Sequence, residues 1–196
     1  ANAHGDLGEP RRQRELLERA LQIKERHLGP DHYRVAVTLH ELACAHGYLG
    51  EPRRQRELLE RALRIKERHF GPDHYRVAIT LHELACAHGD LGELRQKREL
   101  LQRALRIEER HFGPGHFEVA ITLYNLAMTH YDLGDLGEAE ALLERSLRID
   151  RAHYGLYHPS TAMDRVALAW VRARRALRAG LAQVQALARV RARRAA

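Results

Sequence analysis

The sequence repeats itself every 42 residues. Gly-Pro-Asp-His occupies residues 29–32 and again 71–74, and the related Gly-Pro-Gly-His and Gly-Leu-Tyr-His occupy residues 113–116 and 155–158. Residues 29–70 and 71–112 differ at only seven positions. Periods of about 20–50 residues are typical of arrays in which each supersecondary unit packs only against its neighbours. We therefore expect a stack of similar units.

Each unit contains two amphipathic segments. The first has one apolar face with helical spacing, formed by Val35, Leu39, Leu42, Ala43 and His46. After Gly47 and Gly50, Pro52 suits the first turn of a second helix, whose apolar side is Leu58, Leu59, Ala62, Leu63 and Ile65. Glu57 with Arg61 and Glu60 with Arg64 are predicted to pair on its solvated side. The unit is thus predicted to be a helical hairpin.

Other repeat classes have similar periods. Propeller blades need short strands rich in β-branched and aromatic residues, whereas these units are dominated by Leu, Ala, Glu and Arg. HEAT and armadillo units also run to about 40–47 residues. The positions of Leu39, Leu42, Ala43 and Ala62 fit the tetratricopeptide pattern of large and small residues better.

Residues 119–127, residues 135–149 and the Gly-Pro-Asp-His linkers resemble the kinesin-light-chain type of tetratricopeptide repeat, over residues 3 to about 170. The resemblance implies an all-α fold, a right-handed superhelical solenoid of antiparallel helix pairs. We expect the array to cover residues 1–156, starting mid-repeat, with about three and a half units. Residues 157–196 are expected to form a degenerate last repeat and a basic C-terminal capping helix. The first unit lacks its first half, and the sequence does not specify whether the chain is a fragment of a longer array.

The resemblance also implies a concave surface, lined by one face of the first helix of each unit, on which an extended peptide lies. Of the family's Leu-Asn-Asn-Leu-Ala phrase, only Asn125 keeps an amide. The alternative to peptide binding is that small residues on this face only allow neighbouring first helices to pack closely. The four predicted tiers of this groove are Val37, His40, Cys44 and Tyr48; Ile79, His82, Cys86 and Asp90; Ile121, Tyr124, Met128 and Asp132; and Met163, Val166, Trp170 and Arg174.

Residues 40–44, His-Glu-Leu-Ala-Cys, nearly match the His-Glu-x-x-His helix of zinc hydrolases. His40 with Cys44 and His82 with Cys86 form a set that zinc accepts. The third copy has Tyr124 and Met128 at these positions, so repetition accounts for the coincidence. We predict no metal, no cofactor and no enzymatic activity.

Two sets of histidines recur with the repeat. His32, His74, His116 and His158 precede the first helix of each unit and are predicted to cap or pack against its start. The second set, His46, His88 and His130, is predicted to lie in the core with satisfied polar atoms.

Charge is concentrated at one end. The net charge is +7, yet residues 157–196 hold nine arginines against the single acid Asp164, which leaves 24 basic and 25 acidic residues in 1–156. Because Ala173 and Ala176 replace the turn glycines, the helix after Pro159 should run about one turn longer than its counterparts. Its arginine-rich end either caps the array or contacts nucleic acid or an acidic partner. This candidate basic patch is Arg189, Arg191, Arg193 and Arg194.

These observations predict a cytoplasmic scaffold that binds a peptide or partner protein in the concave groove. No apolar stretch approaches the ~20 residues of a membrane span, and the N-terminus does not resemble a signal peptide, so no membrane contact is expected. An architectural subunit of a larger assembly is the alternative, and nucleic acid is the less favoured partner. The sequence does not specify the oligomeric state.

Overall fold

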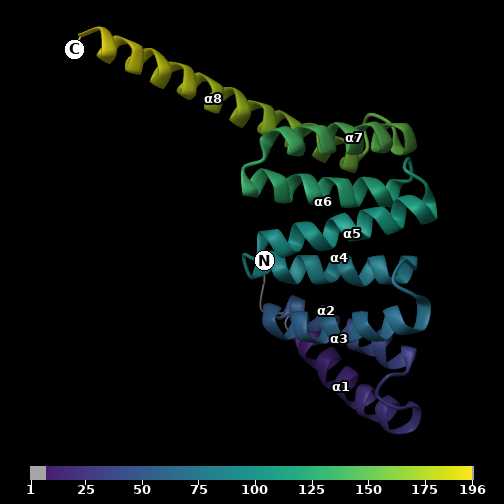
Figure 1. The fold of residues 1–196 in the computed structure, drawn as a ribbon. Helices are drawn as coiled ribbons and strands as arrows, with labels where there is room; N and C mark the ends of the chain where they lie inside the picture. The colour runs from purple at the N-terminus through teal and green to yellow at the C-terminus, as the bar shows by residue number, and fades with distance from the viewer. Residues whose placement is uncertain (1–7, 196) are drawn as a thin grey trace. The chain divides into compact units, whose positions relative to one another are not determined.

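The computed structural model describes the backbone of residues 8–195 and the side chains of residues 11–186 and 189. This part of the chain is all α-helical, which confirms the predicted fold class, and successive helices pair in antiparallel fashion (Figure 1). The eight helices are α1 (Gly8–Leu28), α2 (Tyr33–Tyr48), α3 (Pro52–Phe70), α4 (Tyr75–Asp90), α5 (Leu94–Phe112), α6 (Phe117–Leu133), α7 (Leu136–Tyr154) and α8 (Pro159–Ala195).

The chain divides into two compact units, residues 1–114 and 115–196. In the first unit, α2 pairs with α3 and α4 with α5, while α1 packs on α2 and α3 on α4. In the second unit, α6 pairs with α7, and α8 packs on α7. None of the helices in the described part of the chain is both long enough and apolar enough to cross a bilayer.

Glycine ends the helices at fixed points of the repeat. All residues with positive φ in the described chain are glycines, and they fall at two repeat positions, Gly29, Gly71, Gly113 and Gly155, and Gly50, Gly92 and Gly134. Gly71, with φ of 89°, follows α3 and donates its N–H to Glu67 O at 2.9 Å. Only glycine adopts this left-handed geometry without a steric penalty. The 42-residue period therefore fixes where every hairpin turns.

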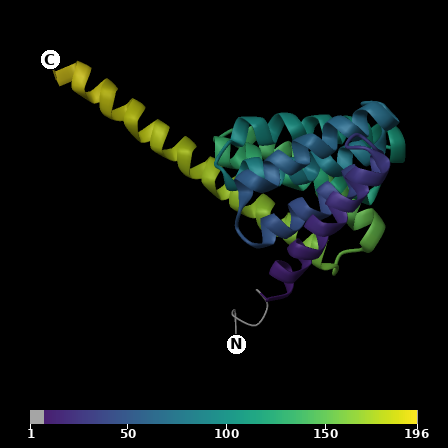
Figure 2. The same ribbon diagram turned by 90° about the horizontal axis from the view of Figure 1, so that it is seen from below.

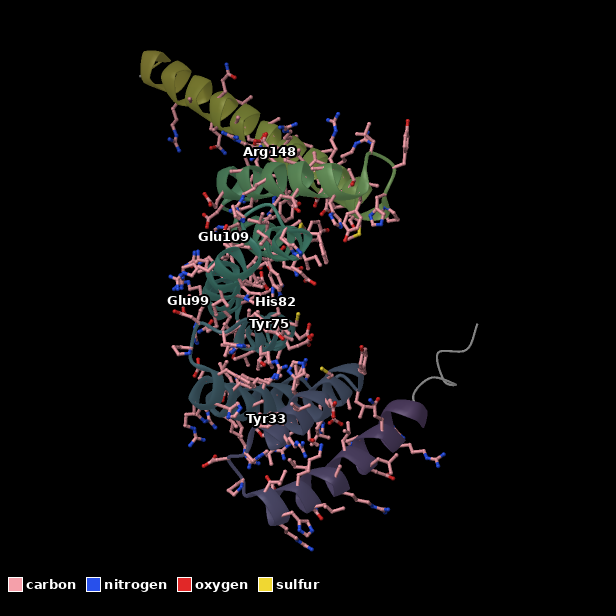
Figure 3. The ribbon with its side chains drawn as sticks, turned by 90° about the vertical axis from the view of Figure 1, so that its right-hand side faces the viewer. Tyr33, Tyr75, His82, Glu99, Glu109 and Arg148 are labelled. Atoms are coloured by element: carbon pink, nitrogen blue, oxygen red, sulfur yellow. The ribbon has the colours of Figure 1, made fainter. Side chains whose placement is uncertain are left out.

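The linker histidines cap helices, as predicted. His32 Nδ1 accepts the backbone N–H of Arg34 at 3.2 Å, and His74, His116 and His158 repeat this bond with the residue two positions on. Aromatic stacking adds a contact that the sequence did not reveal. Tyr33 and Tyr75, labelled in Figure 3, stack on His69 and His111 with ring centroids 4.8 and 4.7 Å apart.

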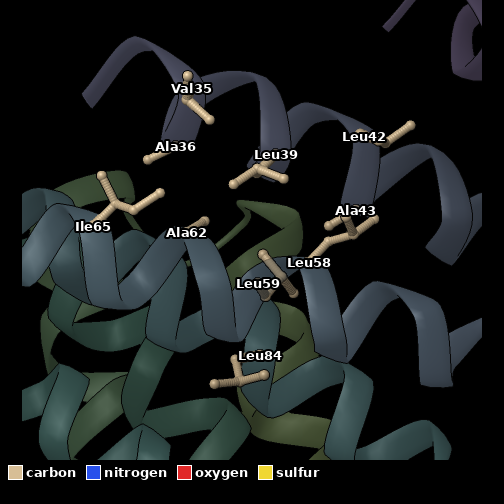
Figure 4. Close-up of a cluster of buried hydrophobic side chains, with 10 residues drawn as sticks. All are labelled: Val35, Ala36, Leu39, Leu42, Ala43, Leu58, Leu59, Ala62, Ile65 and Leu84. Atoms are coloured by element: carbon tan, nitrogen blue, oxygen red, sulfur yellow. The ribbon is translucent and has the colours of Figure 1, made fainter. Parts of the chain in front are cut away.

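The core of the first unit consists of the predicted apolar faces (Figure 4). Leu39 on α2 and Leu59 on α3 have no exposed surface, and Leu84 of α4 joins the same cluster. Burying one such side chain contributes about 1.5–3 kcal/mol. His46 is also buried, and its Nδ1 lies 2.5 Å from Glu51 Oε2, as predicted. The buried His130 Nδ1 has no hydrogen bond, so the prediction is wrong for His130.

Ion pairs join successive hairpins in the first unit. Arg61 Nη1 lies 2.7 Å from Glu25 Oε1, and Arg103 repeats the contact with Glu67 at 2.6 Å. The predicted pair of Arg61 with Glu57 is therefore wrong. Arg61 instead bridges α3 to α1, because its guanidinium also donates to Pro30 O at the turn that follows α1.

Helix α8 is a single 37-residue helix, so the predicted extension by one turn is wrong (Figures 1 and 2). Gly180 does not end it, because one glycine costs a helix only about 1 kcal/mol and no turn sequence follows. The first part of α8 packs on α7, and Arg172 and Arg175 both bind Glu140 there, at 2.7 and 2.6 Å. Further along, Leu181 is 62% exposed.

Candidate binding groove

The predicted groove residues of the first unit lie on the first helices of its hairpins, α2 and α4. Val37 and Ile79 are 41% and 49% exposed, and Tyr48 is 76% exposed. Cys44, Tyr48 and Asp90 line one cavity of about 260 Å³, together with Gly47, Gln55 and Glu83. The structure thus brings residues of two predicted tiers together. Cys86 is exposed, and His40 and His82 are half-buried.

A row of buried polar groups lies behind this surface. Lys24 Nζ donates to Thr38 Oγ1 at 2.6 Å, and Lys66 Nζ donates to Thr80 Oγ1 at 2.7 Å. Burial lowers the pKa of Lys66 to about 8. Burial, with the charge of Lys66, lowers the pKa of His40 to about 4. His40 is therefore neutral at pH 7.

The cysteines lack the features of reactive or metal-binding thiols. Burial and the charge of Glu83 raise the pKa of Cys44 to about 11, and the same two causes raise the pKa of Cys86. The thiolate is the form that attacks electrophiles and binds metals. Within the described residues, no cluster of three or more His, Cys, Asp or Glu side chains is arranged to hold a metal ion.

His82 is already engaged within the first unit. Its Nε2 lies 3.2 Å from Glu108 Oε1 of α5. Glu108 occupies the repeat position of Lys66 and is one of the seven differences between the two near-identical copies. The change from lysine to glutamate therefore gives the two histidines of the groove different neighbours.

The second unit has an apolar cavity of about 530 Å³ along the predicted groove. Tyr124 and Met128 on α6 face Met163, Val166 and Trp170 on α8 across it. Trp170 is 68% exposed, and Val166 and Met163 are 59% and 56% exposed. The sequence had placed all five in the groove. It missed the other lining residues, Tyr131, Pro159, Ala162, Ala167 and Val171.

A smaller cavity of about 250 Å³ adjoins the first, since Tyr124 and Met163 line both. The predicted groove residues Ile121 and Asn125 border it, together with Asp150 of α7 and Asp164 of α8. The side chains at 150 and 164 were not predicted. The sequence did contain a signal for Asp164, since the repeat breaks there: the equivalent residues 42 and 84 positions earlier are both threonine.

Asp164 is the most perturbed acid of this cavity. It is 2% exposed, and its Oδ1 lies 3.1 Å from Ser146 Oγ, while its Oδ2 is buried without a hydrogen-bond partner. Burial raises the pKa of Asp164 to about 7 against the opposing bond from Ser146, and the charge of Asp150 adds to the increase. Burial also raises the pKa of Asp150.

The remaining predicted residues do not converge on one site. Asp132 is exposed, and the guanidinium carbon of Arg174 lies 4.4 Å from the centroid of the Tyr131 ring, a cation–π contact. In the candidate basic patch, Arg189 is exposed. The side chains of Arg191, Arg193 and Arg194 lie outside the described residues.

The family profile described as tetratricopeptide repeat matches residues 1–68, 90–152 and 118–183. No curated protein matches the sequence.

Solved structures resemble the fold across most of the chain. A protein of Podosopora anserina, described as a kinesin light chain with nearly identical TPR-like repeats, and a variant of it are each 27% identical with a TM-score of 0.77. They match 91% of this chain and 86% and 87% of their own. BtubC (BKLC) from P. vanneervenii matches 84% of this chain and 65% of its own at 23% identity, with a TM-score of 0.76. This last likeness supports the fold alone.

Proposed function

Because the chain belongs to the tetratricopeptide repeat family, whose members generally serve as protein-interaction scaffolds, we propose that it binds a segment of a partner protein in its groove. Proteins of this fold are typically non-enzymatic. We place the main contact on the second unit, between α6 and α8. Two free cysteines with protonated thiols at neutral pH support a reducing, cytoplasmic location.

The observation that carries this proposal is the open apolar cavity around Trp170. Its volume of about 530 Å³ lies within the roughly 300–1,000 Å³ of typical ligand pockets. Trp and Tyr are enriched among the residues that dominate binding energy, and here both line the cavity while Trp170 stays largely exposed. A large apolar side chain of the partner would remove this surface from water.

Affinity capture with the unmodified chain and with the Trp170→Ala and Tyr124→Ala variants tests the proposal. Either substitution should reduce partner binding at least tenfold, because truncation of a central aromatic typically costs about 2 kcal/mol or more. Tyr157→Ala is the matched control, since Tyr157 is 97% exposed and lies outside the cavity lining. Retention of every partner by both groove variants would rule the proposal out.

A permanent assembly contact through α8 is the second candidate. It is favoured by the exposure of Leu177, Leu181 and Val184, at 67%, 62% and 64%, on the part of α8 that extends away from α6 and α7 (Figure 2). Peptide-display selection separates the two candidates. A groove binder should return a shared short motif that depends on Trp170, whereas an assembly subunit should return none and lose its partner when residues 181–196 are removed.

A further inference from the structure

Two repeat positions bring side chains of adjacent helices together inside the array. In the first unit, the first position is lysine at residues 24 and 66, and the second is threonine at residues 38 and 80. Lys24 donates to Thr38 and Lys66 donates to Thr80, each ammonium within 2.7 Å of the hydroxyl oxygen. In the second unit, the same positions are occupied by Asp150 on α7 and Asp164 on α8. The first position is thus lysine in two units, glutamate at 108 and aspartate at 150, and only at 150 and 164 are both positions acidic.

The carboxyl groups of Asp150 and Asp164 have no lysine or arginine beside them among the described residues that line the cavity. Asp150 and Asp164 are 6% and 2% exposed, and Asp164 Oδ2 has no hydrogen-bond partner. Buried carboxylates are normally paired or hydrogen-bonded, since an unpaired buried charge is costly. An unpartnered oxygen in a cavity that opens beside the Trp170 site indicates a place for a group supplied from outside.

We infer that the partner segment carries a lysine beside a large apolar side chain, with the lysine ammonium seated between Asp150 and Asp164 and the apolar side chain in the Trp170 cavity. This inference rests on the proposed function. Lysine fits for two reasons. Its ammonium is the group that the fold holds at this position in the first unit, and its apolar stem can follow Tyr124 and Met163, which line both cavities.

The electrostatics of the cavity couple lysine binding to pH. The titratable side chains that face it are Tyr124 on α6, Asp150 and Tyr154 on α7, and Asp164 on α8, with His153 and His158 acting on Asp150. With a pKa of about 7, Asp164 is about one-tenth ionised at pH 6 and nine-tenths at pH 8. An ammonium requires the ionised form, so affinity for a lysine peptide should rise about tenfold between these values.

The test begins with selection of random displayed peptides on the unmodified 196-residue chain at pH 8. Selected peptides should contain a lysine close to an aromatic or large aliphatic residue. One of them is then synthesised together with a twin in which norleucine replaces the lysine. Both carry a fluorescent label and are titrated by fluorescence anisotropy, a readout that also works for the Trp170→Ala variant. The lysine peptide should bind at least tenfold more tightly at pH 8.

Matched variants locate the effect. Asp164→Asn should remove both the preference for lysine and the rise in affinity with pH, while Glu138→Gln, which deletes an exposed charge on α7, should change neither. Asp164→Thr restores the residue of the other units and provides a second variant if the asparagine variant is unstable. Circular dichroism checks that each variant is folded.

Several results would overturn the inference. Equal affinity for the norleucine twin, with binding still abolished by Trp170→Ala, would remove the lysine site and leave the proposed function intact. Selected peptides that carry arginine or a free N-terminal amine instead of lysine would also contradict it. Failure to select any peptide that depends on Trp170 would overturn the proposed function and this inference together.

Discussion

Lys66 and Asp164 show how burial acts on single residues of this array. Burial lowers the pKa of the Lys66 ammonium to about 8 and raises that of the Asp164 carboxyl to about 7. Both shifts favour the neutral form, which is the expected response of an acid or a base removed from water. Lys66 has a hydroxyl partner in Thr80, whereas one oxygen of Asp164 has none. Burial of Asp164 therefore lowers the stability of the folded state when its carboxyl is ionised.

The first prediction concerns the pH dependence of stability at Asp164. Its folded pKa of about 7 lies above the unfolded value of 3.8, so the folded state holds the extra proton. The stability contributed by this proton is fully present below pH 3.8 and is lost as the pH rises through 7. Asp164→Asn should therefore stabilise the free protein by roughly 4 kcal/mol at pH 8, at about 1.4 kcal/mol for each of the three pKa units.

Urea denaturation followed by circular dichroism at pH 4.5 and pH 8 measures this difference. At pH 4.5 the difference should fall to about 1 kcal/mol, because the carboxyl is protonated in the folded protein and the pH is only slightly above the unfolded pKa of 3.8. Glu138→Gln serves as the exposed control and should show no change between the two values. A constant difference across the pH range would show that Asp164 does not titrate as its burial implies.

At the scale of helices, sequence reasoning succeeded where a local pattern decides the outcome. The apolar spacing located α2 and α3, Gly71 and its equivalents fixed the turns, and the N-terminal caps followed from His32 and its copies. The length of α8 was predicted wrongly because the repeat pattern implied a turn near Gly180, whereas one glycine without a turn sequence after it does not end a helix. The Arg61 contact was missed for a related reason, since i,i+4 rules do not include a neighbouring hairpin.

The second prediction tests stacking of one hairpin on the next. Leu17 on α1 and Leu59 on α3 occupy the same repeat position, but Leu17 is half-buried and Leu59 has no exposed surface. Leu59→Ala should cost about 2–5 kcal/mol of unfolding free energy, because it leaves a cavity in the cluster shown in Figure 4.

Leu17→Ala is the matched control, and it should cost less than half as much, because fewer of its neighbours lose contact. Urea denaturation of both variants provides the comparison. Equal losses at the two positions would mean that the apolar face of α3 contributes no more to the core than that of α1, contrary to the observed burial.

At the scale of the whole molecule, the sequence predicted where the basic residues are concentrated but not which groups they contact. Residues 157–196 hold nine arginines, and four of these arginines contact α6, α7 or the turn between them. Two bind acidic side chains, one donates to a backbone carbonyl and one covers a tyrosine ring. These are Arg172, Arg175, Arg178 and Arg174. Several residues of the candidate groove were also predicted from the sequence. Its division into an apolar and an acidic cavity was not, because this division depends on how α6, α7 and α8 pack together.

The third prediction separates the groove from the basic end of α8. Deletion of residues 181–196 removes Arg189, Arg191, Arg193 and Arg194. If about four arginines contact phosphates, binding of poly(U) should fall about fiftyfold between 50 and 200 mM salt, because the released counterions set the slope. The deletion should abolish this binding, while Trp170→Ala should leave it unchanged.

The same two variants should give the opposite result with a groove peptide. Deletion of residues 181–196 leaves the lining of the Trp170 cavity intact, since the last lining residue is Val171. Peptide affinity should therefore persist in the deletion variant and be lost in Trp170→Ala, with a weaker dependence on salt because the contact is mainly apolar. Fluorescence anisotropy with labelled poly(U) and labelled peptide measures both. Loss of peptide binding on deletion would show that the end of α8 belongs to the groove, and would assign one surface, rather than two, to the partners of this chain.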